Sequence, residues 1–284
     1  MKSFRDYITL TKPRLNSLAI LTTLAGFYMA SRGPMDGQLL LLTLLGTTGV
    51  AAGCGALNQW LEADTDLHMV RTKKRPLPSG RLTRSQAFWF GLVLSILGVV
   101  LLDWKVNDLT ALLGLSALVS YIIFYTPMKR ISSLCTVVGA FPGAIPPVMG
   151  WTAVRGQVGH EGWVLFAILF LWQMPHFLAI GWMYRDDYAR AGLPMLAVVD
   201  PKGHGTGLMA VAYSFALWPV SLMPSFLHMT GHLYFWCALV LSFIFLWTSF
   251  RLAWSKTERQ AKGLFWASIT YLPILFIVMA FDKA

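Results

Sequence analysis

Charged side chains are scarce in this sequence. Asp, Glu, Lys and Arg together account for 13% of its 284 residues, whereas hydrophobic residues account for 56%. Soluble globular domains carry about 25% charged residues, so this composition excludes an ordinary soluble protein. The sequence contains long runs of apolar residues without charged side chains. These runs predict an all-α polytopic membrane protein whose main partner is the lipid bilayer.

Cysteine is also rare. The three cysteines, Cys54, Cys135 and Cys237, all fall inside apolar runs, where a thiol behaves as a small apolar side chain. Their spacing gives no Cys-x-x-Cys pair and no disulfide framework. The sequence therefore excludes a disulfide scaffold and a cysteine-based metal centre.

The apolar runs predict about nine transmembrane helices packed as a bundle around a central cavity that opens to the cytoplasmic face. They lie near residues 15–31, 39–61, 86–102, 109–125, 132–153, 163–183, 207–226, 233–250 and 263–281.

Acidic residues are outnumbered by Lys and Arg, 13 against 23. With the N-terminus in the cytoplasm, 19 of the 23 cations fall on the cytoplasmic side, and the exceptions are Arg32, Lys105, Arg155 and Lys283. This is the positive-inside distribution of a membrane protein. It predicts a cytoplasmic N-terminus and an external C-terminus, and it excludes nucleic acid as the partner of the basic residues.

Residues 58–81 form the densest polar segment. Asn58, Glu62 and Asp66 recur at steps of four, which places them on one face of a helix, with Asp64 on the other side. If the helix unwinds here, as its closely spaced Asp and Thr residues favour, the three carboxylates converge. Carboxylate oxygens are ligands that Mg²⁺ takes, together with water and phosphate.

Basic residues follow these carboxylates within the same loop. Acidic residues followed by basic residues in one loop indicate a site for a polyanion. A metal ion on the carboxylates would bridge to the polyanion, and the Arg and Lys side chains would bind its other oxygens. Diphosphate fits this description. The alternative is that the loop only sets membrane topology. The cations are Arg71, Lys73, Lys74, Arg75, Arg81 and Arg84.

A second acidic loop, YRDDYARAGLPML at 184–196, contains Asp186 and Asp187. It follows the sixth span as the first loop follows the second, so both lie on one membrane face and can share metal ions. The spacing favours one domain over 1–284, with a parallel repeat of 15–125 and 132–250 and a final helix at 263–281.

Two apolar spans contain prolines that disturb a regular helix. The span after YTPMKRIS carries Pro142, Pro146 and Pro147, which predicts a broken or kinked helix beside a cavity. The sixth span ends in WQMPHF at 172–177, which we interpret as a polar interruption. His176 is the one histidine at membrane depth and is therefore a functional candidate. Alternatively, it satisfies a carbonyl that Pro175 leaves free.

These motifs resemble those of the intramembrane aromatic prenyltransferases of the UbiA superfamily, and within it the haem-farnesylating branch. The signature N-x-x-x-D-x-D-x-D aligns with Asn58, Glu62, Asp64 and Asp66. The following R-T-x-x-R-P-L-x-x-G run begins at Arg71, and YTPMKR, GAIPPVMGW, WQMPHF and YRDDYARAGLPML indicate the branch. Two departures stand out: Glu62 replaces the first Asp, and the adjacent Asp186 and Asp187 replace a D-x-x-x-D motif.

The resemblance implies an Mg²⁺-dependent enzyme that transfers a farnesyl group from farnesyl diphosphate to a vinyl group of haem B. It implies a bacterial inner membrane location, an active site facing the cytoplasm, and haem A synthase or a terminal oxidase as assembly partners. The implied metal ligands are Glu62, Asp64, Asp66, Asp186 and Asp187, which with Asn58 form the catalytic set. The implied diphosphate ligands are Arg71, Arg75, Lys129, Arg130 and Arg185, and His176 is the candidate haem-binding residue.

Two other functions fit the same patterns. The acceptor of the prenyl group can be a quinone-precursor ring, since the acidic loops do not distinguish acceptors. A secondary transporter of an organic anion also contains broken helices and a central polar site. The clustering of acids at one membrane face disfavours transport.

Overall fold

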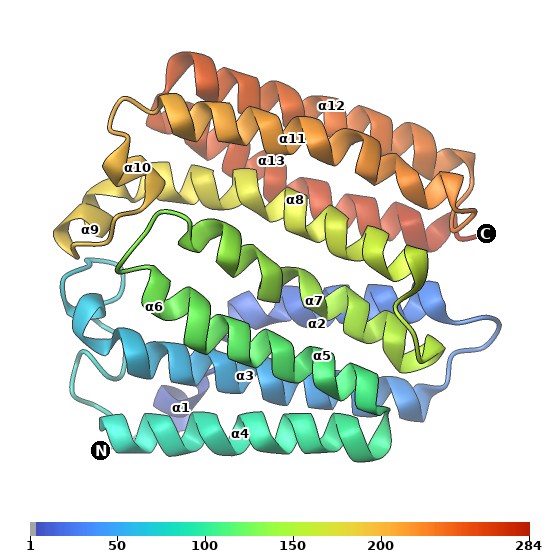
Figure 1. The fold of residues 1–284 in the computed structure, drawn as a ribbon, viewed down its shortest axis with the longest axis horizontal. Helices are drawn as coiled ribbons and strands as arrows, with labels where there is room; N and C mark the ends of the chain where they lie inside the picture. Colours follow the sequence, from blue (N-terminus) through green and yellow to red (C-terminus); the bar gives the residue numbers. More distant parts are fainter. Residues whose placement is uncertain (1–3) are drawn as a thin grey trace.

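The computed structural model describes residues 4–284, which form a bundle of long helices lying side by side (Figure 1). The bundle helices are α2 (Pro13–Ala30), α3 (Gly37–Leu67), α4 (Arg84–Lys105), α5 (Asp108–Val119), α7 (Cys135–Arg155), α8 (Gly159–Met183), α11 (His204–Phe226), α12 (His232–Ser255) and α13 (Glu258–Phe281). Short helices are α1 (Phe4–Leu10), α6 (Thr126–Met128), α9 (Arg185–Arg190) and α10 (Leu196–Val199), and η1 (Ser120–Tyr125) is a π-helical turn that joins α5 to α6.

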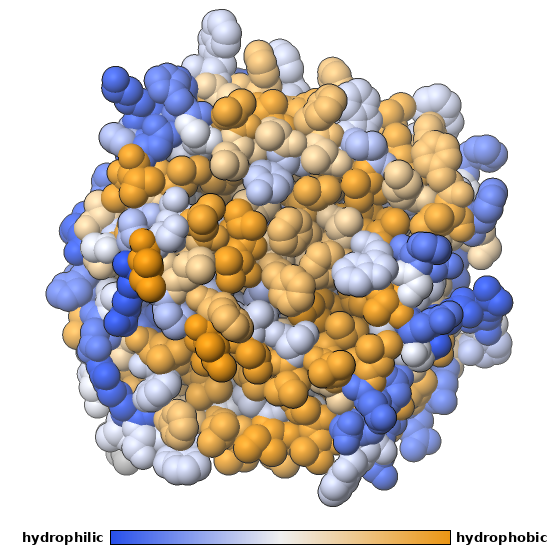
Figure 2. All heavy atoms as spheres, in the orientation of Figure 1, coloured by the Kyte–Doolittle hydropathy of each residue, from blue (hydrophilic) through white to orange (hydrophobic). Residues whose placement is uncertain are grey.

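Within residues 4–284, eight helical segments are long and apolar enough to cross a membrane. Figure 2 shows apolar residues over the middle of the molecule and hydrophilic residues at the two ends of the helices. This confirms the predicted all-α polytopic membrane protein. The remaining expected span, 15–31, corresponds to α2, which has 18 residues and begins with polar ones. The count of nine spans and the orientation stay predictions.

The proline-rich helix α7 lies inside the bundle, where it packs against α2, α5 and α8. It continues as one helix through Pro142, Pro146 and Pro147, so the predicted break is wrong. Pro142 and Pro146 line a cavity, as expected. The hydroxyl of Thr23 donates to the Pro146 carbonyl at 3.0 Å. Prolines are tolerated in a helix that is buried between the other helices of a membrane protein.

Glycine allows α2 and α7 to approach closely. A Cβ atom added at Gly150 would lie 1.9 Å from the Thr23 carbonyl oxygen, and one at Gly26 would lie 1.9 Å from the Pro147 carbonyl oxygen. Small residues at such crossings let helix backbones touch inside a membrane. The α2–α7 contact therefore depends on the absence of side chains at these two positions.

Two helices are more regular than the sequence indicated. Helix α8 ends at Met183, as the expected span 163–183 does, and it continues through Pro175, so WQMPHF does not interrupt it. Helix α3 continues past residue 61 to Leu67, so the expected unwinding at Asp64 is wrong. The acidic residues that were expected in a loop therefore have fixed helical directions.

Helices α3 and α8 end at the same end of the bundle, beside α9 and α10, whereas the C-terminus lies at the opposite end (Figure 1). The loops that follow them touch, because the backbone N–H of Val70 donates to Asp187 Oδ1 at 3.4 Å. The two acidic loops therefore share one end of the bundle, as the sequence predicted.

Candidate active site

A cavity of about 490 Å³ lies inside the bundle between α2, α3, η1, α7 and α8. Its polar end lies under the loops that follow α3 and α8, and its other end is lined by apolar residues of α2, α3 and α7. Helix α3 lines it from Asp66 to Thr47; at 1.5 Å per residue this is about 28 Å. The cavity thus has one charged end and a long apolar body.

Glu62 and Asp66 project from one face of α3 into the polar end of the cavity. Asp64 projects elsewhere: its side chain is 65% exposed and pairs with Arg84. Residues four apart share a helix face, whereas residues two apart do not. Because α3 stays helical here, the three carboxylates do not converge.

Each of these two carboxylates has a cationic partner from a different segment. Lys129 Nζ lies 2.6 Å from Glu62 Oε1, and Arg75 Nη1 lies 2.7 Å from Asp66 Oδ2. Burial opposes the charge of Lys129, but the Glu62 carboxylate holds the lysine pKa well above its ordinary value. The polar end is therefore built from two ion pairs that bring together α3, the loop after it and the segment after α6.

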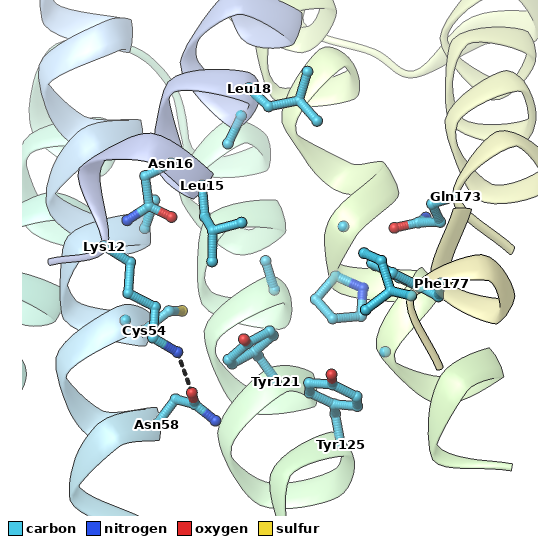
Figure 3. Close-up of a pocket in the computed structure, with 18 of the residues that line it drawn as sticks. Lys12, Leu15, Asn16, Leu18, Cys54, Asn58, Tyr121, Tyr125, Gln173 and Phe177 are labelled. Carbon is cyan, nitrogen blue, oxygen red and sulfur yellow. Dashed lines mark hydrogen bonds between the residues drawn. The ribbon is translucent and has the colours of Figure 1, made fainter. Parts of the chain in front are cut away.

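Lys12 is a third cation at this end. It precedes α2 in a left-handed conformation, with φ of 49°, and it donates to the side chain of Asn58 (Figure 3). Burial, together with the nearby charges of Arg75 and Lys129, lowers the pKa of Lys12 to about 7. Left-handed non-glycine residues are uncommon, and such strain gathers at functional sites.

The second acidic loop contributes unequally. Asp187 is buried, accepts from Val70 N–H and pairs with Arg190, whereas the Asp186 side chain is 85% exposed. Only Asp187 thus faces the first loop. The adjacent Tyr188 reaches the cavity wall.

Arg71 connects the two loops. Its Nη2 donates to the Tyr188 hydroxyl at 2.7 Å, and its guanidinium lies 4.9 and 4.8 Å from the ring centroids of Tyr184 and Tyr188. Arg71 also lines the cavity. Arg130 and Arg185 do not: Arg130 donates to the Leu61 carbonyl at 3.0 Å, and Arg185 lies over the Trp182 ring.

His176 lines the cavity from α8 and is held by α13. Its ring stacks between Trp172 and Phe265, each at a centroid distance of 5.2 Å, and its Nδ1 lies 2.7 Å from Ser268 Oγ. The Ser268 hydroxyl donates to the Phe265 carbonyl at 2.6 Å. A hydroxyl has one proton to donate. When Ser268 gives it to this carbonyl, Nδ1 carries the imidazole proton and the lone pair of Nε2 is available.

Sequence reasoning missed several residues of the cavity wall, among them Lys12, Tyr121, Tyr125 and Tyr188. Lys12 was counted only as a topology determinant. Its position directly before Pro13 was a usable signal. Proline is common at the first position of a helix, so it predicts that Lys12 lies at the start of the apolar helix. The tyrosines carried no such signal, since aromatic residues are common at membrane interfaces.

The fold and the cavity define an integral membrane protein that holds a cationic and acidic cluster at one end of a deep apolar chamber. Such a chamber suits an amphiphilic anion. The UbiA prenyltransferase family model matches residues 19–277. The chain belongs to this family and is therefore a prenyltransferase enzyme.

Relatives and solved structures agree with this assignment. Protoheme IX farnesyltransferase of Solibacter usitatus is 48% identical over 98% of this chain and 99% of its own length. The enzyme of the same name from Opitutus terrae is 44% identical over 99% and 95%. A digeranylgeranylglyceryl phosphate synthase structure has the same fold, with a TM-score of 0.83 over 99% of both chains at 17% identity. A UbiA homologue from Archaeoglobus fulgidus, bound to DMAPP and Mg²⁺, gives 0.62 at 16% identity and covers 97% of this chain and 99% of its own.

Proposed function

We propose that this enzyme transfers the farnesyl group of farnesyl diphosphate to a vinyl group of haem B, which gives haem O and diphosphate. The observation that carries the proposal is the cluster of Lys12, Arg75 and Lys129 at the polar end of the apolar cavity. Cations suit the diphosphate, and the apolar body suits a long isoprenoid chain. The relatives' shared name supports the choice of donor and acceptor.

A divalent cation, Mg²⁺, fits the carboxylates of this cluster. Asp66 Oδ1 is buried and has no hydrogen-bond partner among residues 4–284, and an unpaired buried carboxylate oxygen is a ready ligand for a hard cation. Glu62 lines the same end of the cavity and would hold the ion with Asp66, whereas Asp187 is not part of the cavity lining. No group of three or more His, Cys, Asp or Glu side chains in the described part of the chain is placed to hold a metal ion, so diphosphate oxygens and water would complete the coordination. The ion would supply positive charge to the leaving diphosphate.

The protein's own residues stabilise the leaving group. Arg75 and Lys129 each exchange part of a carboxylate contact for a contact with diphosphate oxygens, and Lys12 adds a third cation when it is protonated. Charge stabilisation in a site that excludes water is commonly the largest contribution to catalysis. The bond between C1 of the farnesyl chain and the diphosphate oxygen breaks, and its electron pair leaves with the diphosphate.

The apolar walls protect the allylic cation from water until the vinyl group attacks C1. The new carbon–carbon bond leaves a cation on the former vinyl group. A water molecule adds there and loses a proton, which gives the hydroxyethylfarnesyl substituent. The residues around the cavity therefore position reactants and exclude water, and they form no covalent intermediate.

His176 supports haem as the acceptor. Its Nδ1–H is held by Ser268, and this leaves Nε2 as a free lone pair toward a ligand. A second partner that fixes the tautomer is the usual arrangement for a histidine that binds a metal. We infer that Nε2 coordinates haem iron. A quinone-precursor ring contains no metal and would not use this nitrogen.

We place the enzyme in the bacterial inner membrane with the polar end of the cavity toward the cytoplasm. The loops after α3 and α8 lie at one end of the bundle, and they belong to the side on which 19 of the 23 Lys and Arg residues were predicted. Haem A synthase or a terminal oxidase would receive the product.

The test is an assay of membranes that contain the protein, supplied with haem B, farnesyl diphosphate and Mg²⁺ and read by product mass. We expect haem O and diphosphate in equal amounts. Farnesylated quinone precursor without haem O would replace the proposal with the quinone alternative.

A further inference from the structure

The proposed reaction needs one water molecule inside a chamber that must otherwise exclude water. Bulk water would capture the allylic cation before the vinyl group reaches it. The hydroxyl group of the product nevertheless comes from a water molecule, which adds after the carbon–carbon bond has formed. A polar group in the cavity wall that holds a single water away from the diphosphate would meet both requirements.

Gln173 is a polar side chain of this kind on α8. It lines the cavity and is only 4% exposed. Its Nε2 donates to the Ala140 carbonyl of α7 at 2.6 Å. Only the nitrogen end of an amide donates, so this bond fixes which end of the side chain is the oxygen. Figure 3 shows the Gln173 side chain directed from its helix into the cavity.

The oxygen of this amide is free and held in position. No donor among residues 4–284 forms a hydrogen bond with Gln173 Oε1. The oxygen packs against Gly143 of α7, because a Cβ atom added there would lie 2.2 Å from Oε1. The absence of a side chain at Gly143 therefore leaves room for the oxygen.

This place in the wall suits one ordered water molecule. A buried acceptor without a partner loses a hydrogen bond that it makes in water, and a bound water restores it. Pro147 has no N–H for the Gly143 carbonyl four residues earlier, which leaves that carbonyl available as a second partner for the water. The cavity, at about 490 Å³, has ample room.

Gln173 also lies beside the proposed haem ligand. His176 is three residues further along α8, and residues three apart lie on one helix face with their Cβ atoms about 5–6 Å apart. Trp172 holds this part of α8 against α13, because its Nε1 donates to the Ser268 carbonyl at 2.9 Å. Gln173 is about 4.5 Å further from the charged end of the cavity than His176. A water on Oε1 is thus near the rim of the haem and away from the diphosphate.

We propose that Gln173 Oε1 holds the water molecule that adds to the farnesylated vinyl group. The inference rests on the proposed function. When the terminal vinyl carbon bonds to C1, the positive charge moves to the other vinyl carbon. The water donates one O–H to Oε1 and uses its lone pair to form the new carbon–oxygen bond. The proton that it then loses passes to the released diphosphate, so no oxidant or reductant is needed.

The same cation has a second fate when no water is in position. It loses a proton from the neighbouring carbon and becomes an alkene, which is lighter than haem O by one water molecule. Both products contain the farnesyl group, because the two fates separate only after the carbon–carbon bond has formed. The ratio of dehydrated product to haem O therefore reports the water site and not the earlier steps.

The test measures this ratio by product mass in membranes that contain each variant. Gln173→Met keeps the length of the side chain and removes the acceptor. Gly143→Ala displaces the same oxygen from the facing helix and leaves Gln173 in place. Gly181→Ala on α8 is the matched control, because an added Cβ there has nothing within 4 Å. Affinity for farnesyl thiodiphosphate, an unreactive analogue, reports whether each variant is folded.

We expect the ratio of dehydrated product to haem O to rise by about tenfold in Gln173→Met and in Gly143→Ala, the effect of one lost hydrogen bond on the rate of water addition. Total farnesylated haem and analogue affinity should stay near those of the wild type, and Gly181→Ala should keep the wild-type ratio. If Gln173→Met loses analogue affinity, Gly143→Ala decides.

An unchanged ratio in the folded variants would overturn the proposal. A fall in total farnesylated haem at a constant ratio would also overturn it, because a purely structural role gives that result. Failure of the proposed function is distinguishable, because the wild-type protein would then form no farnesylated haem of either mass.

Discussion

We expect the proposed binding of diphosphate to depend on pH through Lys12. Burial lowers its pKa to about 7, so the free enzyme carries the protonated side chain mainly below this pH. A diphosphate binds better to the protonated form. If only that form binds, the apparent dissociation constant increases by the factor 1 + 10^(pH − 7). This factor is about 1.1 at pH 6 and about 11 at pH 8, so affinity falls by about tenfold over this range.

The measurement is titration calorimetry with farnesyl thiodiphosphate at pH 6, 7 and 8. Two buffers with different ionisation enthalpies also report proton uptake, which we expect to be about half a proton at pH 7, where Lys12 is half protonated. The control is Lys12→Arg, which stays charged across this range and retains only the pH dependence of the diphosphate and of the other groups. An identical pH dependence in wild type and Lys12→Arg would refute the assignment of Lys12 to the diphosphate site.

Three substitutions test other parts of the site. Asp66→Asn should lower turnover, measured by product mass, by 100-fold or more, on the order of several kcal/mol of charge stabilisation. Asp64→Asn should lower turnover far less, because Asp64 is exposed and pairs with Arg84. Equal losses of turnover in the two variants would contradict the geometry of α3. Arg75→Lys should weaken the affinity for farnesyl thiodiphosphate by about tenfold. The planar guanidinium of Arg can contact a carboxylate and a diphosphate at the same time, whereas the compact ammonium of Lys cannot. Unchanged affinity would assign Arg75 a purely structural role. His176→Ala should weaken haem binding and shift the haem absorption spectrum while analogue affinity stays the same; an unshifted spectrum with normal haem affinity would remove His176 from the haem pocket.

The sequence predicted the fold class well, because apolar runs and the distribution of cations follow directly from the bilayer. It also predicted that the loops after the second and sixth spans meet. It failed where tertiary packing decided a helix end. Asp64 was grouped with Glu62 and Asp66 because the local residues favour unwinding, but α3 continues to Leu67 and directs Asp64 away.

Proline was misread for the same reason. Pro175 and the prolines of α7 suggest broken helices when each span is read alone, yet both helices continue through them inside the bundle. The partners of Lys12 and His176, Asn58 and Ser268, lie 46 and 92 residues away in the chain. Contacts of this range depend on the assembled bundle and have no local sequence signal.

The cationic end of the cavity should hold the diphosphate of a prenyl donor. The most direct measurement is an experimental structure of the protein with farnesyl thiodiphosphate and Mn²⁺, in which anomalous scattering locates the metal. We expect manganese beside Asp66, diphosphate oxygens at Arg75 and Lys129, and the farnesyl chain along Tyr125 and Tyr121. A diphosphate bound elsewhere, with the Glu62–Lys129 and Asp66–Arg75 pairs unchanged and the cavity empty, would contradict it.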